Sequence, residues 1–592
     1  MSALNLTYSV RTHKDTLDSL YLKAKLNMKY LINLIQQFNR QIVQLFRNDS
    51  FSFSFAVLFI AYLLLVLPRT YGVNDNVGIL FDAKGGFISS ESISFFYMTL
   101  LHLLYQMSND IPWYGLTLYV VHILSLFIFV RSLVRIESFS AFFVPFLIVY
   151  LYFYSFFITQ IDYSSTSIMV GASSLFAFLV LLSNRKVTIF PVLGLGLLFS
   201  LSFSIRIPGA YAVLVYGLPI IGLFFINQFQ KTKYLVIFLM PFLLLWIGDN
   251  LARTYLTSPE YQQYREFNIL RGKLHGFPIL EANQNNKRIL IENNWTQNDY
   301  DRFANWNFFD ERKYNANTLS NIFKYSVLEE DNKIQKYLGL YFQKFSKLVT
   351  HPENKWPIYF LFLICVLIIF KFYWFLTLIT LCYLSYAVSV SIYLEIFYRF
   401  PARIAHPILL MCTSFVILLI FHLWADKFPV KNNNLLATTF ILGIFWFLFN
   451  IGMRHNISTN MAFNLSLNRL QSAYQGKILY IPPIVLQWEK MDPLKRYHFN
   501  FHKMVYAGGT GTFSPSFYKE LETLGVKKGY EMIPALINNP NAYVIAMKNH
   551  HYCMTSDMME NDNLKCKAVV VDQLPNDRVI LKLKPKRTSL WK

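Results

Sequence analysis

Long apolar stretches, separated by short polar segments, dominate the chain from residue 51 to residue 452. Each stretch holds about 20 predominantly apolar residues, the length that an α-helix needs to cross the hydrocarbon core of a membrane. The pattern predicts a polytopic α-helical membrane protein with about 11 transmembrane helices. The predicted spans are 51–69, 114–132, 139–158, 166–183, 187–205, 208–228, 234–252, 357–371, 373–393, 405–425 and 435–452.

The charge of the short loops alternates along the chain and predicts how it crosses the membrane. The first fifty residues hold three aspartates, and their basic residues are Arg11, Lys14, Lys23, Lys25, Lys29, Arg40 and Arg47. Every second loop after the first span is short and basic; these loops are 131–135, 184–186, 230–233, Lys371 and 426–431. Cytoplasmic loops are enriched in Lys and Arg, so we expect a cytoplasmic N-terminus and, after eleven spans, an outer C-terminus.

Two long polar segments fall on the predicted outer side. The second of them repeats short strand-like runs at 477–481, 503–506, 542–547, 566–571 and 578–583, which predicts a small α/β domain. We therefore expect a membrane chain with five parts. They are a cytoplasmic basic amphipathic segment (1–50), an N-terminal transmembrane module with the first outer loop and an interfacial helix (51–252), a large extracytoplasmic loop (253–356), the C-terminal transmembrane helices (357–452) and an extracytoplasmic α/β domain (453–592).

Composition agrees with a membrane protein and limits the classes of partner. The chain is 54% hydrophobic and only 15% charged, which is too apolar for an ordinary soluble protein. Its net charge is +21, but the excess is spread over many loops without an aromatic-basic binding module, so we expect no nucleic-acid partner. Membrane lipids account for the charge more simply, and residues 20–46 predict a helix on the anionic cytoplasmic leaflet. The first fifty residues lack the apolar region of a cleavable signal peptide.

The five cysteines do not indicate a metal site. Cys365, Cys382 and Cys412 fall in predicted spans, where we expect apolar packing. Cys553 and Cys566 lie in the predicted outer domain, where an oxidising compartment permits a disulfide between them. No spacing is typical of a zinc site.

Asp75 is the acidic residue with the most informative position. It lies in Tyr71-Gly-Val-Asn-Asp-Asn-Val-Gly78, shortly after the first span, and therefore just outside the bilayer on the predicted outer side. Farther along this first outer loop, Ser89 or Ser90 can cap a helix that runs to about Met107. The helix has few polar positions, so we expect it to lie in the membrane interface.

This order of a span, a short turn with Asn74-Asp75, an interfacial helix and a second span resembles the C-type (GT-C) glycosyltransferases. These are polytopic enzymes that use lipid-phosphate-linked sugars on the outer face of the membrane. The Tyr-Gly-x-Asn-Asp stretch is also similar to uncharacterised bacterial membrane proteins from surface-polysaccharide clusters, as are Arg271-Gly-Lys-Leu-His275 and Trp295-Thr-Gln-Asn-Asp299 with Trp306. The resemblance implies a bacterial inner-membrane protein of cell-envelope polysaccharide biosynthesis, with Asp75 as the catalytic base of an inverting transfer.

The resemblance also implies the substrates, namely a polyprenyl-phosphate or polyprenyl-diphosphate sugar as donor and a glycan or lipid as acceptor. Such a transfer requires a base for the acceptor hydroxyl and positive charge for the departing phosphate. Many enzymes of the class carry two adjacent acids, whereas asparagines flank Asp75. A divalent cation is therefore left open as a cofactor, and we assign no metal ligand. The competing interpretation of Asp75 is a plain turn residue, since Asn-Asp-Asn is also typical of turns.

Two further acids lie near the same predicted surface. Asp82 falls in Phe81-Asp-Ala-Lys-Gly-Gly86, where we expect a solvated turn. Asp162 follows the third predicted span, at the same depth as Asp75. An acid of a second outer loop can hold a metal or orient the acceptor, which makes Asp162 a second catalytic candidate.

Three arginines lie on the predicted outer side, against the charge rule for loops. Arg206 separates two spans, and Arg399 and Arg403 precede His406 at the start of another. Arginine binds phosphate through two parallel hydrogen bonds, and a lipid phosphate lies at this depth. We expect these residues to bind the donor phosphate, with a hydrogen bond from His406. Contact with lipid headgroups or with Glu395 is the alternative.

A basic cluster follows the seventh span. Arg271, Lys273 and His275 are candidates for a phosphate or acceptor pocket, and a solvated helix face is the alternative. Trp295 and Trp306 can stack on sugar rings, but burial in the core of the loop is the favoured interpretation.

Two other functions compete with glycosyl transfer. An O-antigen or capsule-type polymerase or ligase would also have a large outer loop and essential arginines, but would not depend on Asp75. A transporter or flippase is disfavoured, because the sequence has no inverted repeat and few charges within its spans.

Overall fold

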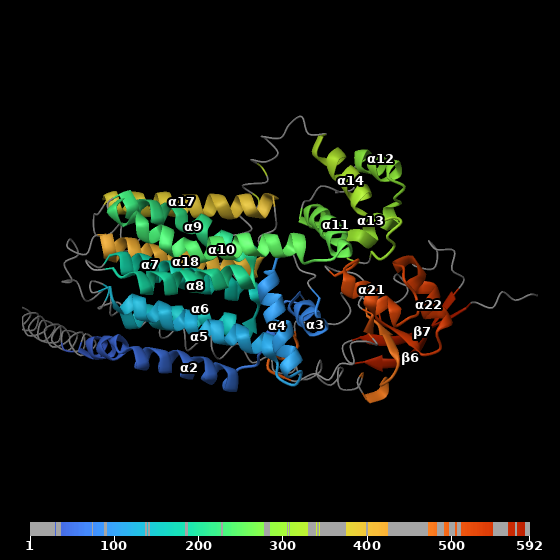
Figure 1. Ribbon diagram of the computed structural model, residues 1–592, viewed down its shortest axis with the longest axis horizontal. Helices are drawn as coiled ribbons and strands as arrows, with labels where there is room; N and C mark the ends of the chain where they lie inside the picture. The colour runs from blue at the N-terminus through green and yellow to red at the C-terminus, as the bar shows by residue number, and fades with distance from the viewer. Residues whose placement is uncertain are drawn as a thin grey trace, which may run out of the picture.

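The computed structural model is predominantly helical, and its long helices lie side by side in one bundle (Figure 1). It describes residues 30, 37–73, 75–87, 92–136, 139, 143–183, 187–226, 229–276, 284–304, 306, 308–328, 339, 343, 374–397, 401–423, 470, 472–481, 490–495, 504–505, 511–548, 566–574 and 577–585. Five helices in these ranges are long and apolar enough to cross a membrane, and four further apolar helices are shorter.

The bundle helices coincide with predicted spans, with ends that differ by a few residues. They are α2 (Asp49–Val66), α5 (Trp113–Val134), α6 (Phe143–Thr159), α7 (Tyr163–Leu182), α8 (Ile189–Ile205), α9 (Ile207–Ile226), α10 (Thr232–Tyr255, preceded by the 3-10 turn η2, Phe229–Lys231), α17 (Trp374–Phe397) and α18 (Ala402–Leu423). The predicted spans 357–371 and 435–452 lie outside the described residues.

Helix α7 lies at the centre of the bundle and packs against α5, α8, α9 and α18. Small residues allow this close packing, because they let two backbones approach. A methyl group at Gly171 would lie 2.7 Å from the hydroxyl of Ser202 on α8. The hydroxyls of Ser167 and Ser202 each donate to the other residue's carbonyl, at 2.8 and 2.7 Å. The centre of the bundle is therefore closely packed, and its helices carry the groups at its end.

Two short helices cover one end of the bundle (Figure 1). Helix α3 (Asp75–Gly85) begins at Asp75 itself, and α4 (Phe95–Met107) lies across the ends of the bundle helices. The N-cap of α4 is Ser94, whose hydroxyl accepts from the Phe96 N–H, and not Ser89 or Ser90, which lie outside the described residues. The predicted turn around Asp82 is wrong: buried Val77, Ile79, Leu80 and Ala83 give α3 an apolar face that extends the helix to Gly85.

The long loop and the tail form one structural unit beyond α3 and α4, which we call the head unit (Figure 1). The loop contributes α11 (Pro259–Gly276), α12 (Gln284–Glu292), α13 (Gln297–Ala304) and α14 (Ala316–Leu328). The tail contributes β3 (Ile478–Tyr480), β4 (Met504–Val505), α21 (Pro515–Glu522), η6 (Gly529–Glu531), α22 (Met532–Asn538), β5 (Ala542–Met547), β6 (Cys566–Leu574) and β7 (Arg578–Pro585).

The five tail strands form a mixed sheet in the order β4-β3-β5-β7-β6. Strands β4, β3 and β5 run parallel, and β7 is antiparallel to both β5 and β6. Loop and tail share one hydrophobic core: Phe267 of α11 lies edge-on to Phe513, with ring centroids 4.9 Å apart. The Gly529 N–H also donates to the Glu311 carboxylate at 3.0 Å. The two predicted outer segments therefore pack together as one unit.

A short tail segment returns to the bundle, and we call residues 490–495 the tail strap. The Met491 carbonyl accepts from the Tyr71 N–H at 3.1 Å, and Asp492 forms an ion pair with Arg69 at 2.8 Å. The Pro493 carbonyl lies so close to Gly115 that a methyl group there would approach it to 2.2 Å. The strap thus attaches the head unit to the residues that lead into α3.

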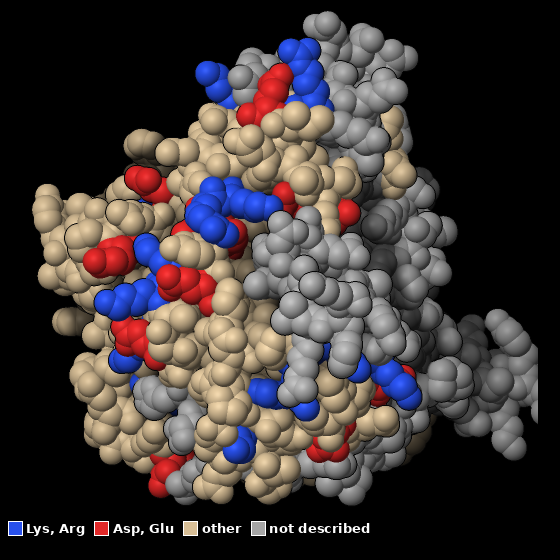
Figure 2. Space-filling view, turned by 90° about the vertical axis from the view of Figure 1, so that its right-hand side faces the viewer, with Lys and Arg blue, Asp and Glu red and all other residues tan. Residues whose placement is uncertain are grey.

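The space-filling view of the head-unit end shows basic and acidic side chains interspersed over the described surface (Figure 2). The positive net charge is therefore not gathered into one basic face on this side.

Candidate functional site

A two-stranded parallel ribbon positions the start of the candidate site. Strand β1 (Thr70–Tyr71) pairs with β2 (Gln160–Ile161), and the Gly72 N–H donates to the Ile161 carbonyl at 2.8 Å. Asp75 follows β1 at the N-terminus of α3, and Tyr163 follows β2 at the N-terminus of α7. Residues almost ninety positions apart in the sequence therefore begin adjacent helices at the same end of the bundle.

Asp75 lies at the centre of a small polar cluster. Arg403, in the first turn of α18, places Nη2 3.3 Å from Asp75 Oδ2, and the Tyr163 hydroxyl donates to the same oxygen at 3.4 Å. The guanidinium of Arg206 stacks over the Tyr163 ring, 4.8 Å from its centroid. The structure thus brings together three residues that the sequence marked, Asp75, Arg206 and Arg403, and adds Tyr163.

Two guanidinium nitrogens of this cluster are buried without a hydrogen-bond partner among the described residues. They are Arg206 Nη1 and Arg403 Nε. A buried N–H of a cation that lacks an acceptor is costly, because it loses water without replacement. The cluster therefore has two N–H donors to spare, and an anion could accept hydrogen bonds from both.

Asn76 explains why an asparagine follows Asp75. Its side chain is fully buried, and its Oδ1 accepts from the Tyr114 hydroxyl at 2.7 Å and the Tyr163 N–H at 3.3 Å. Tyr114 belongs to α5 and Tyr163 to α7, so these two hydrogen bonds attach Asn76, and with it α3, to both helices. No group of three or more His, Cys, Asp or Glu side chains suited to a metal occurs within the described part of the chain.

Asp162 caps helix α7. Its two carboxylate oxygens accept from the Ser164 N–H at 2.7 Å and the Ser165 N–H at 3.1 Å, and the side chain is buried. An acid with both oxygens occupied by backbone donors is a stable N-cap. Asp162 therefore positions Tyr163, and its predicted catalytic role stays a prediction.

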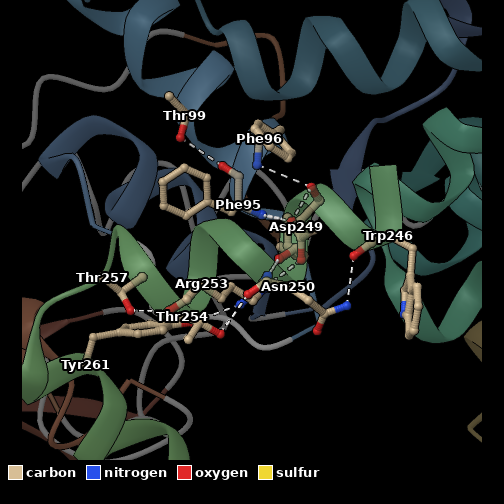
Figure 3. Close-up of polar contacts among 12 residues, drawn as sticks. Phe95, Phe96, Thr99, Trp246, Asp249, Asn250, Arg253, Thr254, Thr257 and Tyr261 are labelled. Carbon is tan, nitrogen blue, oxygen red and sulfur yellow. Dashed lines mark hydrogen bonds and ion pairs between the residues drawn. The ribbon is translucent and has the colours of Figure 1, made fainter. Parts of the chain in front are cut away.

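A buried ion pair between Asp249 and Arg253 lies beside the start of α4 (Figure 3). Asp249 Oδ2 accepts from Arg253 Nε at 2.7 Å, and Oδ1 accepts from the Ser94 hydroxyl at 2.7 Å and the Phe95 N–H at 2.6 Å. Arg253 also donates to the Tyr261 hydroxyl of α11 at 2.9 Å and to the Ile93 carbonyl. The pair therefore ties α4, α10 and α11 together.

Backbone hydrogen bonds connect segment 92–94, which contacts this ion pair, to the residues on either side of Arg206. The Ser94 N–H donates to the Ser204 carbonyl at 3.0 Å, and the Ile207 N–H donates to the Ser92 carbonyl at 2.8 Å. These two bonds bracket Arg206 between α8 and α9 and hold its backbone extended.

Two cations of the predicted basic cluster on α11 lie in different surroundings. Arg271 is buried and stacks over Trp306 at 4.7 Å, whereas Lys273 is exposed and lies over Phe323 of α14 at 5.3 Å. Residues two apart on a helix point in different directions, which separates the two cations. Trp295 is buried in the loop core, as favoured from the sequence, and its indole N–H donates to the Lys313 carbonyl at 3.0 Å.

The remaining candidates are placed only in part. His406 lies one helical turn after Arg403 on α18. Arg399 and Cys553 lie outside the described residues, and the side chains of His275 and Cys566 do too, although their backbones belong to α11 and β6.

Asp82 is a partly buried acid within helix α3 and not the solvated turn residue that the sequence predicted. Burial raises its pKa from 3.8 to about 8, and a hydrogen bond to Ser516 of α21 works in the opposite direction. Lys519 of the same helix lies over the Phe87 ring at 5.2 Å. The end of α3 that is remote from Asp75 therefore docks on the head unit.

We expect Asp82→Asn to flatten the dependence of stability on pH. Since burial raises the pKa, the folded state holds the proton; this stability is fully present below the ordinary pKa and is lost as pH rises towards 8. The wild-type midpoint of thermal unfolding should fall between pH 5 and pH 9 by more than that of the variant. Parallel curves for the two proteins would show that Asp82 is ionised in the folded state.

Three contributors to this region were missed from the sequence. Tyr163 lies near a span end, a position where a tyrosine is typical of the membrane interface. Asn76 directly follows Asp75 in the sequence, and Asp249 lies near the end of a predicted span. Polar residues that come just before or after long apolar runs were the available signal.

Fold and site together define a multi-pass membrane protein whose polar cluster lies where the helical bundle meets the head unit. No protein-family model matches the sequence, and no curated protein matches it. Among solved structures, ArnT from Cupriavidus metallidurans bound to undecaprenyl phosphate aligns with 89% of this chain and 98% of its own, at 12% identity and a TM-score of 0.37. The apo state of ArnT aligns with 89% of this chain and 97% of its own, at 11% identity and the same TM-score. Because these values are low, we base the function on the residues of this chain.

Proposed function

We propose that the protein is a glycosyltransferase that moves a sugar from a polyprenyl-phosphate donor to a glycan or lipid acceptor on the outer face of the membrane. The observation that carries this proposal is the pair of buried, unpartnered nitrogens, Arg206 Nη1 and Arg403 Nε, beside the carboxylate of Asp75. A cationic seat and a base within one cluster are the two requirements of transfer from a lipid phosphate.

In the proposed reaction Asp75 takes the proton of the acceptor hydroxyl. The acceptor oxygen forms a bond to the anomeric carbon of the donor as the bond between that carbon and the phosphate oxygen breaks. The electron pair of the broken bond stays on the phosphate, which gains one negative charge. Base and leaving group lie on opposite faces of the sugar, so the anomeric configuration is inverted.

Each arginine has a separate task in this scheme. Arg206 offers Nη1 to the phosphate, and Tyr163 below it keeps the guanidinium in place. Arg403 contacts Asp75 through Nη2 and offers Nε, so it can join base and phosphate.

Binding of a polyprenyl phosphate tests the cationic seat directly. Purified protein should bind it at least about 10-fold more tightly than the corresponding polyprenyl alcohol, since charge-assisted hydrogen bonds are lost with the phosphate. Arg206→Gln should remove most of this preference, and a transfer assay with polyprenyl-phosphate sugars should yield a glycosylated acceptor. Equal affinity of the wild type for phosphate and alcohol would overturn the proposal, and with it the role of Arg206.

A further inference from the structure

A serine hydroxyl near the start of α7 is buried without a hydrogen-bond partner among the residues that the structure describes. It belongs to Ser164, whose side chain is fully buried. Ser164 directly follows Tyr163, the residue whose hydroxyl donates to Asp75. Two further atoms of this kind, Arg206 Nη1 and Arg403 Nε, belong to the cluster around Asp75. Three polar groups with unused hydrogen-bonding capacity therefore come from the same end of the bundle.

The register between α7 and α9 shows which way Ser164 faces. Three pairs of residues face one another across this interface, each pair about one helical turn farther along both helices. From the Asp75 end inward, they are Ile168 and Gly209, Gly171 and Val213, and Leu175 and Gly217. A methyl group added at the glycine of each pair would lie 3.6, 3.2 and 2.6 Å from its partner's side chain, in that order.

One more step of this register reaches Arg206. Ser164 lies one turn before Ile168 and on the same face of α7. The corresponding step back from Gly209 along the other chain segment reaches Arg206, which directly precedes α9. Ser164 therefore faces the junction of α8 and α9 at Arg206.

Contacts of Ser167 support this placement. Ser167 lies three residues after Ser164, and its hydroxyl oxygen is 3.1 Å from the carbonyl oxygen of Arg206. Ser164 is one turn nearer to the end of the bundle than Ser167. At that end the guanidinium of Arg206 stacks over the Tyr163 ring at 4.8 Å. The hydroxyl of Ser164 is thus directed toward the part of the cluster that contains Arg206.

The unused capacity belongs to the hydroxyl and not to the end of helix α7. The carboxylate of Asp162 accepts from the N–H groups of Ser164 and Ser165, at 2.7 and 3.1 Å. The N–H of Tyr163 donates to Asn76 at 3.3 Å. A buried hydroxyl without a partner costs free energy, because the water that it loses is not replaced. A ligand that accepts a hydrogen bond from Ser164 would recover this cost.

We propose that Ser164 Oγ is a third ligand of the lipid phosphate, beside Arg206 and Arg403. The side chains of Arg403 and Asp75 are 24% and 37% exposed, so the cluster is open on their side and Ser164 lies at its inner end. This inference rests on the proposed function and adds a neutral hydrogen-bond donor to the two cations.

A third donor suits the phosphate that leaves in the proposed reaction. The sugar donor is a phosphodiester with two terminal oxygens, whereas the departing polyprenyl phosphate has three and carries one more negative charge. Three donors from separate parts of the bundle match these three oxygens. We therefore expect the hydrogen bond from Ser164 to be strongest with the departing phosphate.

Ser164→Ala tests the inference, because it removes only this hydroxyl. Titration of the purified full-length protein should show about 10- to 100-fold weaker binding of polyprenyl phosphate, as expected when a hydrogen bond to a charged group is lost. Affinity for the corresponding polyprenyl alcohol should stay within about twofold. The midpoint of thermal unfolding without ligand should stay the same or rise, since the variant no longer buries an unpartnered hydroxyl. Ser164→Cys, whose thiol is a weak donor, should lose affinity in the same way.

Ser165→Ala is the matched control. Ser165 is the next residue of α7 and is also buried, but its hydroxyl donates to the Asp162 carbonyl at 3.2 Å. The opposite result is therefore expected, namely a lower midpoint of thermal unfolding and an unchanged affinity for polyprenyl phosphate.

The outcomes separate this inference from the proposed function. If Ser164→Ala binds polyprenyl phosphate like the wild type while Arg206→Gln loses the preference for phosphate over alcohol, the role of Ser164 is wrong and the proposed function stands. If the wild type itself binds phosphate and alcohol equally, the proposed function fails. A lower unfolding midpoint of Ser164→Ala, with equal losses of affinity for phosphate and alcohol, would show that the hydroxyl supports the fold and would overturn the inference.

Discussion

Asp75→Asn should reduce kcat for sugar transfer by about 10²- to 10⁴-fold, which is the usual contribution of a general base. The amide matches the carboxylate in shape, and its oxygen can still accept from Tyr163, but it cannot take the proton of the acceptor. Affinity for the polyprenyl phosphate should stay within about threefold, because Arg206 is unaffected.

Single-turnover rates at saturating donor measure this effect without a contribution from binding. Asp301→Asn serves as the control, since Asp301 is an exposed acid on α13 of the head unit. Full activity of Asp75→Asn would remove the base assignment. If Arg403 variants were inactive at the same time, the polymerase or ligase alternative would be favoured.

Arg403→Gln should have the second largest effect, a fall in kcat of about 10²- to 10³-fold, as expected when one donor to the developing charge is removed. The substitution removes the charge that faces Asp75 at 3.3 Å together with the unpartnered Nε. Arg403→Lys should recover only a minor part, because an ammonium group cannot contact base and phosphate at once.

Arg131→Gln provides a matched comparison, because Arg131 also pairs with an aspartate, Asp49, but at the opposite end of the bundle. It should leave transfer within about twofold of the wild type, since a partly exposed ion pair contributes little. Equal losses in both variants would mean that Arg403 acts on the fold and not on the reaction.

The bundle could be read from the sequence because long apolar runs and basic loops follow directly from the physics of a bilayer. The same reasoning placed Asp75, Arg206 and Arg403 at one depth, and the structure puts all three into one cluster. Depth is a one-dimensional quantity. It does not reveal which residues at that depth face one another, and this is why Tyr163 was missed.

Other features depend on contacts between distant segments. Asp82 was expected in a turn, since Gly85-Gly86 reads as a break, but the apolar residues before it find a partner surface and continue the helix. Arg271 and Lys273 looked equivalent in the sequence, and only the position of Trp306 separates them. The shared core of loop and tail could not be predicted. The apolar residues of the loop do not show in the sequence that they pack against those of the tail.

The tail strap has a consequence for how the protein is made. The pair Arg69–Asp492 joins positions 423 residues apart, and Met491 supports the strand that leads into α3. During synthesis the first outer loop therefore emerges long before the segment that completes its surroundings. The bundle can insert span by span, but the cluster around Asp75 reaches its final form only after the tail has been delivered and folded. If the proposed function holds, we expect chains that lack the tail to be inactive.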